Sequence, residues 1–172
     1  ITISGGEPFM YPYLLDVLEE KSDMVFQIYT NGTFFNEEIV KRIANMGNIF
    51  PAISIEGFED RTDARRGKGI FKKVMQNIDN LRQWKVPFGF SVTVTRENVD
   101  EVSSEEFVDF MDKKGAFLCW YFMYVPIGRN PNFEMMLTPE QRKEFFDKIS
   151  YYRRVKPIVL ADFWNDGEAV SG

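Results

Sequence analysis

The chain has 172 residues, 44% of them hydrophobic and 27% charged, which predicts one folded domain and excludes disordered, collagenous and disulfide-scaffold classes. Its formal net charge of -5 argues against nucleic acid or an anionic membrane as the main partner, because both attract a basic surface. We therefore expect a small molecule or a protein as partner, with no nucleic acid and no membrane.

Short apolar runs bounded by polar or turn-forming residues predict β-strands. These runs occupy residues 1–3, 24–29, 50–55, 88–95, 117–125 and 157–160. Helical patterns lie between them. Pro12 is expected to open the first helix and Asn36 to cap the second. The third helix is predicted by apolar residues at helical spacing, Ile70, Val74, Ile78 and Leu81.

Capping signals predict two more helices. Ser103, with Glu106 three residues later, is typical of a capping box that begins a helix. Thr138 repeats the pattern, with Pro139 at the first helical position and Gln141 at the third. Strict alternation of helices with strands that are apolar on both faces predicts an α/β fold, a parallel sheet covered by helices.

The loops that follow strands are longer and richer in glycine and polar residues than the loops that precede them. They occupy residues 4–11, 30–36, 56–69, 96–102 and 126–137. Active sites of parallel α/β proteins form from such loops, at the carboxyl ends of the strands. We therefore expect a ligand at this edge of the sheet.

The chain has no histidine and a single cysteine, Cys119. Without histidine, the Ser-His-Asp triad, the histidine-activated cysteine and the histidine zinc site are excluded. One cysteine excludes an internal disulfide and a thiolate cluster built from this chain alone, and it suggests a reducing, cytoplasmic setting. Demanding chemistry would then come from carboxylates, backbone groups or an imported cofactor.

Two turn-like segments follow the first two strands. In the segment of residues 4–8, the pair Gly5-Gly6 permits a close backbone approach to a ligand, and Pro8 biases Glu7 toward extended geometry. A plain tight turn is the other interpretation of this segment. Thr30-Asn31-Gly32 ends the second strand, and an Asn-Gly pair is more often structural than functional.

Three later segments also carry candidate residues. Ser54 and Glu56 are expected on one side of the third strand end, where they would suit a hydroxylated ligand such as ribose. The segment Arg65-Arg66-Gly67-Lys68-Gly69 would place two arginines at a helix start, which favours an anion. Cys119 is interpreted as a buried small hydrophobe rather than a nucleophile.

The order of these motifs resembles the radical S-adenosylmethionine (radical SAM) superfamily. The motifs follow one another in a fixed order over nearly the whole chain. They are GGEP, TNG, SIEG, the RRGKG loop before a helix that bears Asn77 and Leu81, and residues 92–101. The chain is most similar to the branch that contains the molybdenum-cofactor biosynthesis cyclase and the peptide and sulfatase maturases with an auxiliary-cluster (SPASM) domain.

This resemblance implies a partial (β/α)6 TIM-like barrel with parallel strands. A [4Fe-4S] cluster would reductively cleave S-adenosylmethionine (SAM), and the resulting 5′-deoxyadenosyl radical would abstract hydrogen from a small-molecule or peptide substrate. A flavodoxin or ferredoxin would donate the electron. The resemblance implies a set of contacts with the cofactor. The backbone of Gly5, Gly6, Glu7 and Pro8 would bind the methionine amino group, and Ser91 and Thr93 would line the methionine side. Ser54 and Glu56 would contact the ribose and Val125 and Pro126 the adenine, while Thr30 and Asn31 are further cofactor-binding candidates.

The chain departs from the family in one respect. Members hold the cluster with a CxxxCxxC loop upstream of GGEP, which this sequence lacks. We expect residues 1–160 to be a radical SAM core without its N-terminal βα unit, inactive by itself and without metal ligands, and residues 161–172 to be a linker toward a C-terminal domain. Two alternatives stay open: a cluster-independent βα-barrel enzyme that uses Glu7, Glu56 or Asp100 as acid and base, and a non-catalytic binding domain.

Overall fold

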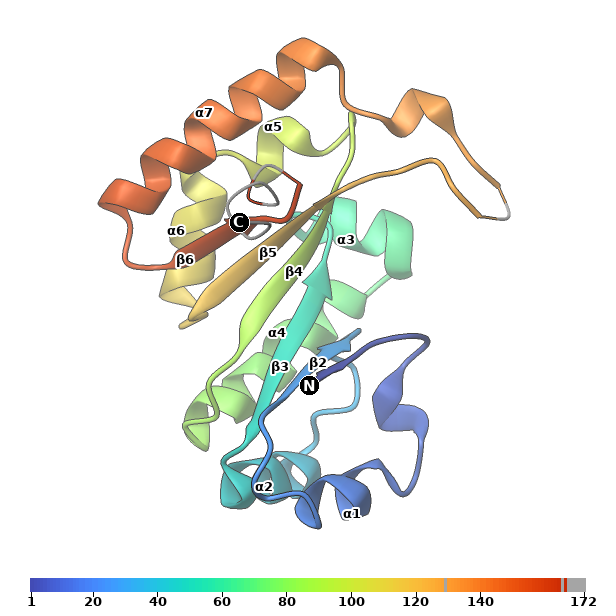
Figure 1. Ribbon diagram of the computed structural model, residues 1–172, viewed down its shortest axis with the longest axis vertical. Helices are drawn as coiled ribbons and strands as arrows, with labels where there is room; N and C mark the ends of the chain where they lie inside the picture. The colour runs from blue at the N-terminus through green and yellow to red at the C-terminus, as the bar shows by residue number, and fades with distance from the viewer. Residues whose placement is uncertain (129, 165, 167–172) are drawn as a thin grey trace.

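Six strands form one parallel sheet in which spatial order follows chain order, from β1 to β6. The computed structural model describes residues 1–128, 130–164 and 166, and Figure 1 shows the strands side by side with α4 behind the middle ones. The strands are β1 (Thr2–Ile3), β2 (Phe26–Thr30), β3 (Ile49–Ile55), β4 (Gly89–Val94), β5 (Leu118–Met123) and β6 (Val159–Asp162). Each predicted apolar run forms a strand, so the predicted parallel α/β fold is confirmed.

Helices connect consecutive strands of this sheet. They are α1 (Leu14–Glu19), α2 (Glu37–Met46), α3 (Glu59–Arg66), α4 (Ile70–Gln83), α5 (Val99–Val102), α6 (Glu105–Lys113) and α7 (Pro139–Val155), with 3-10 turns η1 (Pro8–Met10) and η2 (Phe133–Met135). Two predicted caps are confirmed. Asn36 accepts a hydrogen bond from the Ile39 amide at 2.9 Å, and Thr138 forms a reciprocal capping box with Gln141.

Other helix boundaries predicted from the sequence were wrong. The helix α1 begins after Tyr13 rather than at Pro12. Ser104, not Ser103, caps α6, accepting from the Phe107 amide, because Ser103 already ends α5. The segments predicted as loops at 56–69 and 96–102 contain α3 and α5. Helix α3 has no apolar stripe, and α5 has only four residues, so hydrophobic periodicity detected neither.

The hydrophobic core lies between the sheet and the helices. Every second side chain of a strand points toward the helices. Those of Ile28, Ile53, Val92 and Cys119 do so and are fully buried. We call the opposite side of the sheet the inner face. Strand register places Ser54 beside Ser91 and Ser91 beside Trp120 in one row across this face. Polar side chains therefore project from the inner face near the strand ends.

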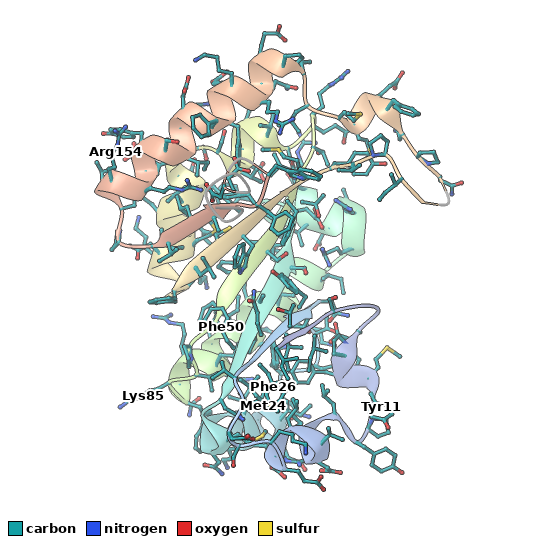
Figure 2. The ribbon with its side chains drawn as sticks, viewed as in Figure 1. Tyr11, Met24, Phe26, Phe50, Lys85 and Arg154 are labelled. Carbon is teal, nitrogen blue, oxygen red and sulfur yellow. The ribbon has the colours of Figure 1, made fainter. Side chains whose placement is uncertain are left out.

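The sheet is curved toward its inner face. The rings of Tyr29 on β2 and Phe122 on β5 are 5.8 Å apart, although β3 and β4 lie between those strands. In a flat sheet three strand spacings would separate the two side chains by about 14 Å. Gly89 on β4 leaves room for this curvature, since a Cβ there would lie 2.6 Å from the Leu118 carbonyl and 3.2 Å from the Phe50 ring. Figure 2 shows Phe50 near mid-sheet. The curvature agrees with the predicted partial barrel.

The chain remains attached to the sheet beyond residue 160. Strand β6 continues to Asp162, and Arg153 of α7 binds both carboxylate oxygens of Asp166 at 2.8 and 2.6 Å. The linker predicted at 161–172 therefore begins with residues of the sheet, and its remaining part stays a prediction because residues 165 and 167–172 lie outside the described residues. None of the described helices combines the length and apolarity needed to cross a bilayer.

Candidate cofactor-binding site

The carboxylate of Glu7 joins the loops that follow β1 and β2. Its Oε1 accepts hydrogen bonds from the Phe9 amide at 3.1 Å and the Thr30 hydroxyl at 2.8 Å, and its Oε2 accepts from the Asn31 amide at 2.7 Å. The structure thus brings together three of the predicted site residues. The sequence pointed to the backbone of Glu7 and did not reveal this role of its side chain.

The neighbouring glycines leave space in front of the backbone. Gly5 has a φ of +133°, which favours glycine, and no atom lies within 4 Å of a Cβ built on either Gly5 or Gly6. Because the Glu7 carboxylate fixes the end of this loop, the peptide groups of Gly5 and Gly6 are both exposed and held in place. Such a loop suits a ligand that binds to backbone atoms.

The Asn31-Gly32 turn has a structural role. Thr30 Oγ1 accepts from the Gly32 amide at 3.1 Å, and Asn77 of α4 donates to the Gly32 carbonyl at 2.8 Å. Gly32 has a φ of +73°, and a Cβ there would lie 2.7 Å from the Ile53 side chain. The turn is therefore packed tightly against β3, next to Ser54.

Three predicted hydroxyl residues lie together on the inner face. Ser54 pairs with Ser91, and Thr93 follows Ser91 by two residues along β4, so all three project from the same side of the sheet. Each is partly exposed. Within the described part of the chain, no group forms a hydrogen bond with any of the three hydroxyls, which leaves them available to a ligand.

Glu56, directly after β3, is held by two arginines. Arg65 Nη1 lies 2.8 Å from Oε2, and Arg66 donates to Oε1 from Nε at 3.1 Å and Nη2 at 2.5 Å. The Glu56 side chain is only 3% exposed. The prediction that Arg65 and Arg66 begin a helix was wrong: they end α3, and the anion they bind is Glu56 itself. The expected ribose contact of Glu56 stays a prediction.

Asn98 is a buried residue of the site that sequence reasoning missed. Its Nδ2 donates to the carbonyl oxygens of Glu56 and Thr93, both at 2.9 Å, and its Oδ1 accepts from the Thr95 amide at 2.7 Å. These bonds tie the end of β3 to the end of β4. The only sequence signal was an Asn shortly after a strand that alternates small hydroxyl residues with valines.

A cavity of about 250 Å³ opens at the same edge, between α3, the turn after β4 and η2. Arg61 and Arg65 of α3 line it, and Arg61 forms no ion pair with a described residue, whereas Arg65 is paired with Glu56. The residues lining the cavity are Glu56, Arg61, Ala64, Arg65, Thr95, Glu97, Asn98 and Met135. The remaining candidates, Val125 and Pro126, follow β5 at this edge of the sheet.

Residues 1–111 match the family model described as the Radical SAM superfamily. This chain belongs to the radical SAM superfamily. The recognition of the family from its ordered motifs is therefore confirmed. Of the three carboxylates named for the acid-base alternative, Glu7 and Glu56 are engaged by the protein itself, and the structure leaves Asp100 untested in that role.

Radical SAM proteins with curated names resemble the chain over most of its length. It is 30% identical over 132 residues to the sporulation killing factor maturation protein SkfB of Bacillus subtilis, covering 75% of this chain and 32% of that protein. It is 30% identical over 165 residues to an AdoMet-dependent heme synthase of Nitratidesulfovibrio vulgaris, covering 93% and 44%. The chain thus spans about a third to half the length of these relatives.

Solved structures show the same fold. The structure titled "Native anSMEcpe with bound AdoMet and Cp18Cys peptide" superposes with a TM-score of 0.76 and 16% identity, covering 95% of this chain and 50% of that chain. Streptococcus suis SuiB bound to S-adenosylmethionine superposes with a TM-score of 0.75 and 16% identity, covering 93% and 38%. At this identity the likeness establishes the fold.

The radical SAM family uses SAM together with a [4Fe-4S] cluster, and the sequence of this chain contains a single cysteine, Cys119. Cys119 is fully buried on the helix side of β5, and burial raises the pKa of its thiol above the usual range. No group of three or more Cys, His, Asp or Glu side chains in the described ranges is placed to hold a metal ion. The described residues therefore do not form a cluster site, and the sequence offers a single thiol.

Proposed function

We propose that this chain is the SAM-binding part of a radical SAM enzyme. The observation that carries the proposal is the meeting of three features at one edge of the sheet: the open backbone at Gly5-Gly6, the free hydroxyls of Ser54, Ser91 and Thr93, and the cavity beside α3. Each suits a different part of a ligand that has amino-acid, sugar and base groups. Sites at the carboxyl ends of parallel strands are the rule for such folds.

Each part of SAM is assigned to residues of this chain. The backbone of residues 5–8 would bind the methionine amino group, and the Glu7 carboxylate, with Thr30 and Asn31, holds that loop in place. Ser91 and Thr93 would contact the methionine, Ser54 and Glu56 the ribose, and Val125 and Pro126 the adenine. The chemistry that SAM supplies in this family is a carbon-centred radical that removes hydrogen from a substrate.

The substrate and the electron donor belong to the same proposal. Two structural neighbours have peptides in their titles, Cp18Cys in one and the precursor peptide SuiA in another. We propose a small-molecule or peptide substrate, a flavodoxin or ferredoxin as electron donor and a cytoplasmic location. Because the cluster thiolates are not among these residues, we assign to this chain the binding of SAM and the positioning of substrate.

Substitution of Gly6 tests the SAM site. The variant Gly6→Val should bind SAM at least about tenfold more weakly in calorimetric titration, because the side chain would occupy the space in front of the loop. Its unfolding midpoint in urea should stay unchanged, since Gly6 has an ordinary φ and no neighbouring atom lies within 4 Å of its Cβ position. Equal SAM affinity in Gly6→Val, or no SAM binding by the unsubstituted chain, would overturn the proposal.

A further inference from the structure

The segment between β5 and α7 extends away from the sheet and returns to it. We call its described residues, 124–128 and 130–137, the arm; Figure 1 shows it leaving the end of β5 and coming back through η2. Ile127 is 80% exposed and Phe133 is 69% exposed, so burial of these side chains does not hold the arm in place. Its position must depend on other contacts.

Leu137 packs against the core at the returning end of the arm, and Arg96, in the turn after β4, adds hydrogen bonds there. Its amide donates to the Met135 carbonyl at 2.9 Å, and its Nε donates to the Met136 carbonyl at 2.8 Å. Gln141 of α7 donates in turn to the Arg96 carbonyl at 3.3 Å. One residue of the β4 turn thus binds the returning end of the arm and the start of α7.

The same part of the arm forms a wall of the cavity. Met135 lines the cavity together with Arg61 and Arg65 of α3, and Thr95, the residue before Arg96, lines it from the β4 turn. If the returning end of the arm moved away from Arg96, Met135 would leave and this side of the cavity would open to solvent. Arg96 itself does not line the cavity, so its effect on a ligand acts through Met135.

We infer that Arg96 is a positioning residue that fastens the arm and thereby sets the affinity of the ligand in the cavity. This inference rests on the proposed function, in which SAM contacts Glu56, a residue of the cavity wall. A ligand that requires the fastened arm binds with an apparent dissociation constant equal to the intrinsic constant divided by the fraction of molecules with the arm fastened. By reciprocity, bound SAM must lower the fraction of molecules in which the arm is open.

Amide hydrogen exchange and SAM titration together test this inference. In Arg96→Ala, the amides of residues 133–137 should exchange several-fold faster than in the unsubstituted chain, and the dissociation constant for SAM should rise in inverse proportion to the fastened fraction calculated from the exchange rates. Arg96→Lys keeps the charge and a donor of comparable reach, and should recover part of both effects. The matched control is Arg154→Ala, which removes an exposed arginine at the far end of α7 (Figure 2) and should change neither.

The possible outcomes separate the inference from the proposed function. Unchanged exchange in Arg96→Ala overturns the inference, and so does faster exchange with an unchanged SAM dissociation constant. If the unsubstituted chain binds SAM normally, either result leaves the proposed function intact. If the unsubstituted chain does not bind SAM, the proposed function fails and the inference about its affinity fails with it.

Discussion

Glu7 and Glu56 follow strands, and the carboxylate of each binds groups of the protein itself. Glu7 accepts hydrogen bonds from one hydroxyl and two amides, and Glu56 from two guanidinium groups. Hydrogen bonds to a carboxylate are about twice as strong as neutral ones, so these side chains can fix loop positions. Their geometry favours a structural task over proton transfer, which is why the acid-base interpretation of these residues loses its support.

Cys119 should be chemically inert in the folded protein. Its thiol is fully buried, and burial raises its pKa, so the reactive thiolate is scarce at neutral pH. At pH 8, Ellman's reagent should label almost none of the native chain within minutes. In guanidinium chloride it should label about one thiol per chain. Rapid labelling of the native protein would contradict the buried position.

Individual residues were predictable where their interactions are local. Asn36 and Thr138 act within three residues of their own positions, so the sequence pattern sufficed for both caps. The partners of Glu56 lie nine and ten residues away on a helix with no apolar pattern. The hydrogen bond from Asn98 to the Glu56 carbonyl spans 42 residues. Such pairings depend on how elements dock, which the pattern of a single segment does not encode.

At the scale of elements, α3 is a polar helix held by specific contacts rather than by burial of an apolar face. Thr62 is its buried residue, and its hydroxyl donates to the Gly57 carbonyl at 3.0 Å while accepting from the Glu56 amide at 3.1 Å. Arg65 and Arg66 add the ion pairs with Glu56. These contacts place α3 at the edge of the cavity.

Asp63 connects α3 to the start of α4 and makes the stability of this connection dependent on pH. Its carboxylate accepts from the Phe71 amide at 2.8 Å and from the Gly69 amide, which lowers its pKa below the usual value. Since the pKa is lower in the folded state, the stabilisation is present above the unfolded-state value of about 3.9 and is lost as pH falls through the folded-state value.

Urea unfolding at several pH values checks this dependence. Asp63→Asn should unfold more easily than the unsubstituted chain at pH 7, and the difference should shrink as the pH is lowered toward 3. Asp60→Asn is the control, because Asp60 lies on the same helix without a hydrogen bond or ion pair to any described residue. A difference for Asp63→Asn that stayed constant with pH would exclude this role.

At the scale of the whole molecule, the parallel sheet was predictable because alternating apolar runs and helical stripes repeat along the chain. The curvature was not, because it depends on contacts such as that between Tyr29 and Phe122, on strands that are not neighbours. The site was predicted as a set of strand-end residues on the basis of family resemblance. The arm and the cavity depend on tertiary docking and were not predicted.

The single buried cysteine also predicts the behaviour of the chain toward iron. Anaerobic reconstitution of these 172 residues with iron and sulfide should leave no stoichiometric iron-sulfur absorption, because a [4Fe-4S] site requires several accessible thiolates. A version extended upstream of residue 1 by a CxxxCxxC segment is the positive comparison. A stoichiometric cluster on the 172 residues themselves would contradict the assignment of this chain to the SAM side of the reaction.

Because strand order follows chain order, each new strand pairs with the one made just before it. During synthesis on the ribosome, every βα unit can therefore dock onto sheet that has already emerged, without waiting for distant sequence. The paired residues at the strand starts are 23 to 41 positions apart, so each closure spans one βα unit and none spans the whole chain. The site at the strand ends would form in the same progression, from the Glu7 loop to the arm fastened by Arg96.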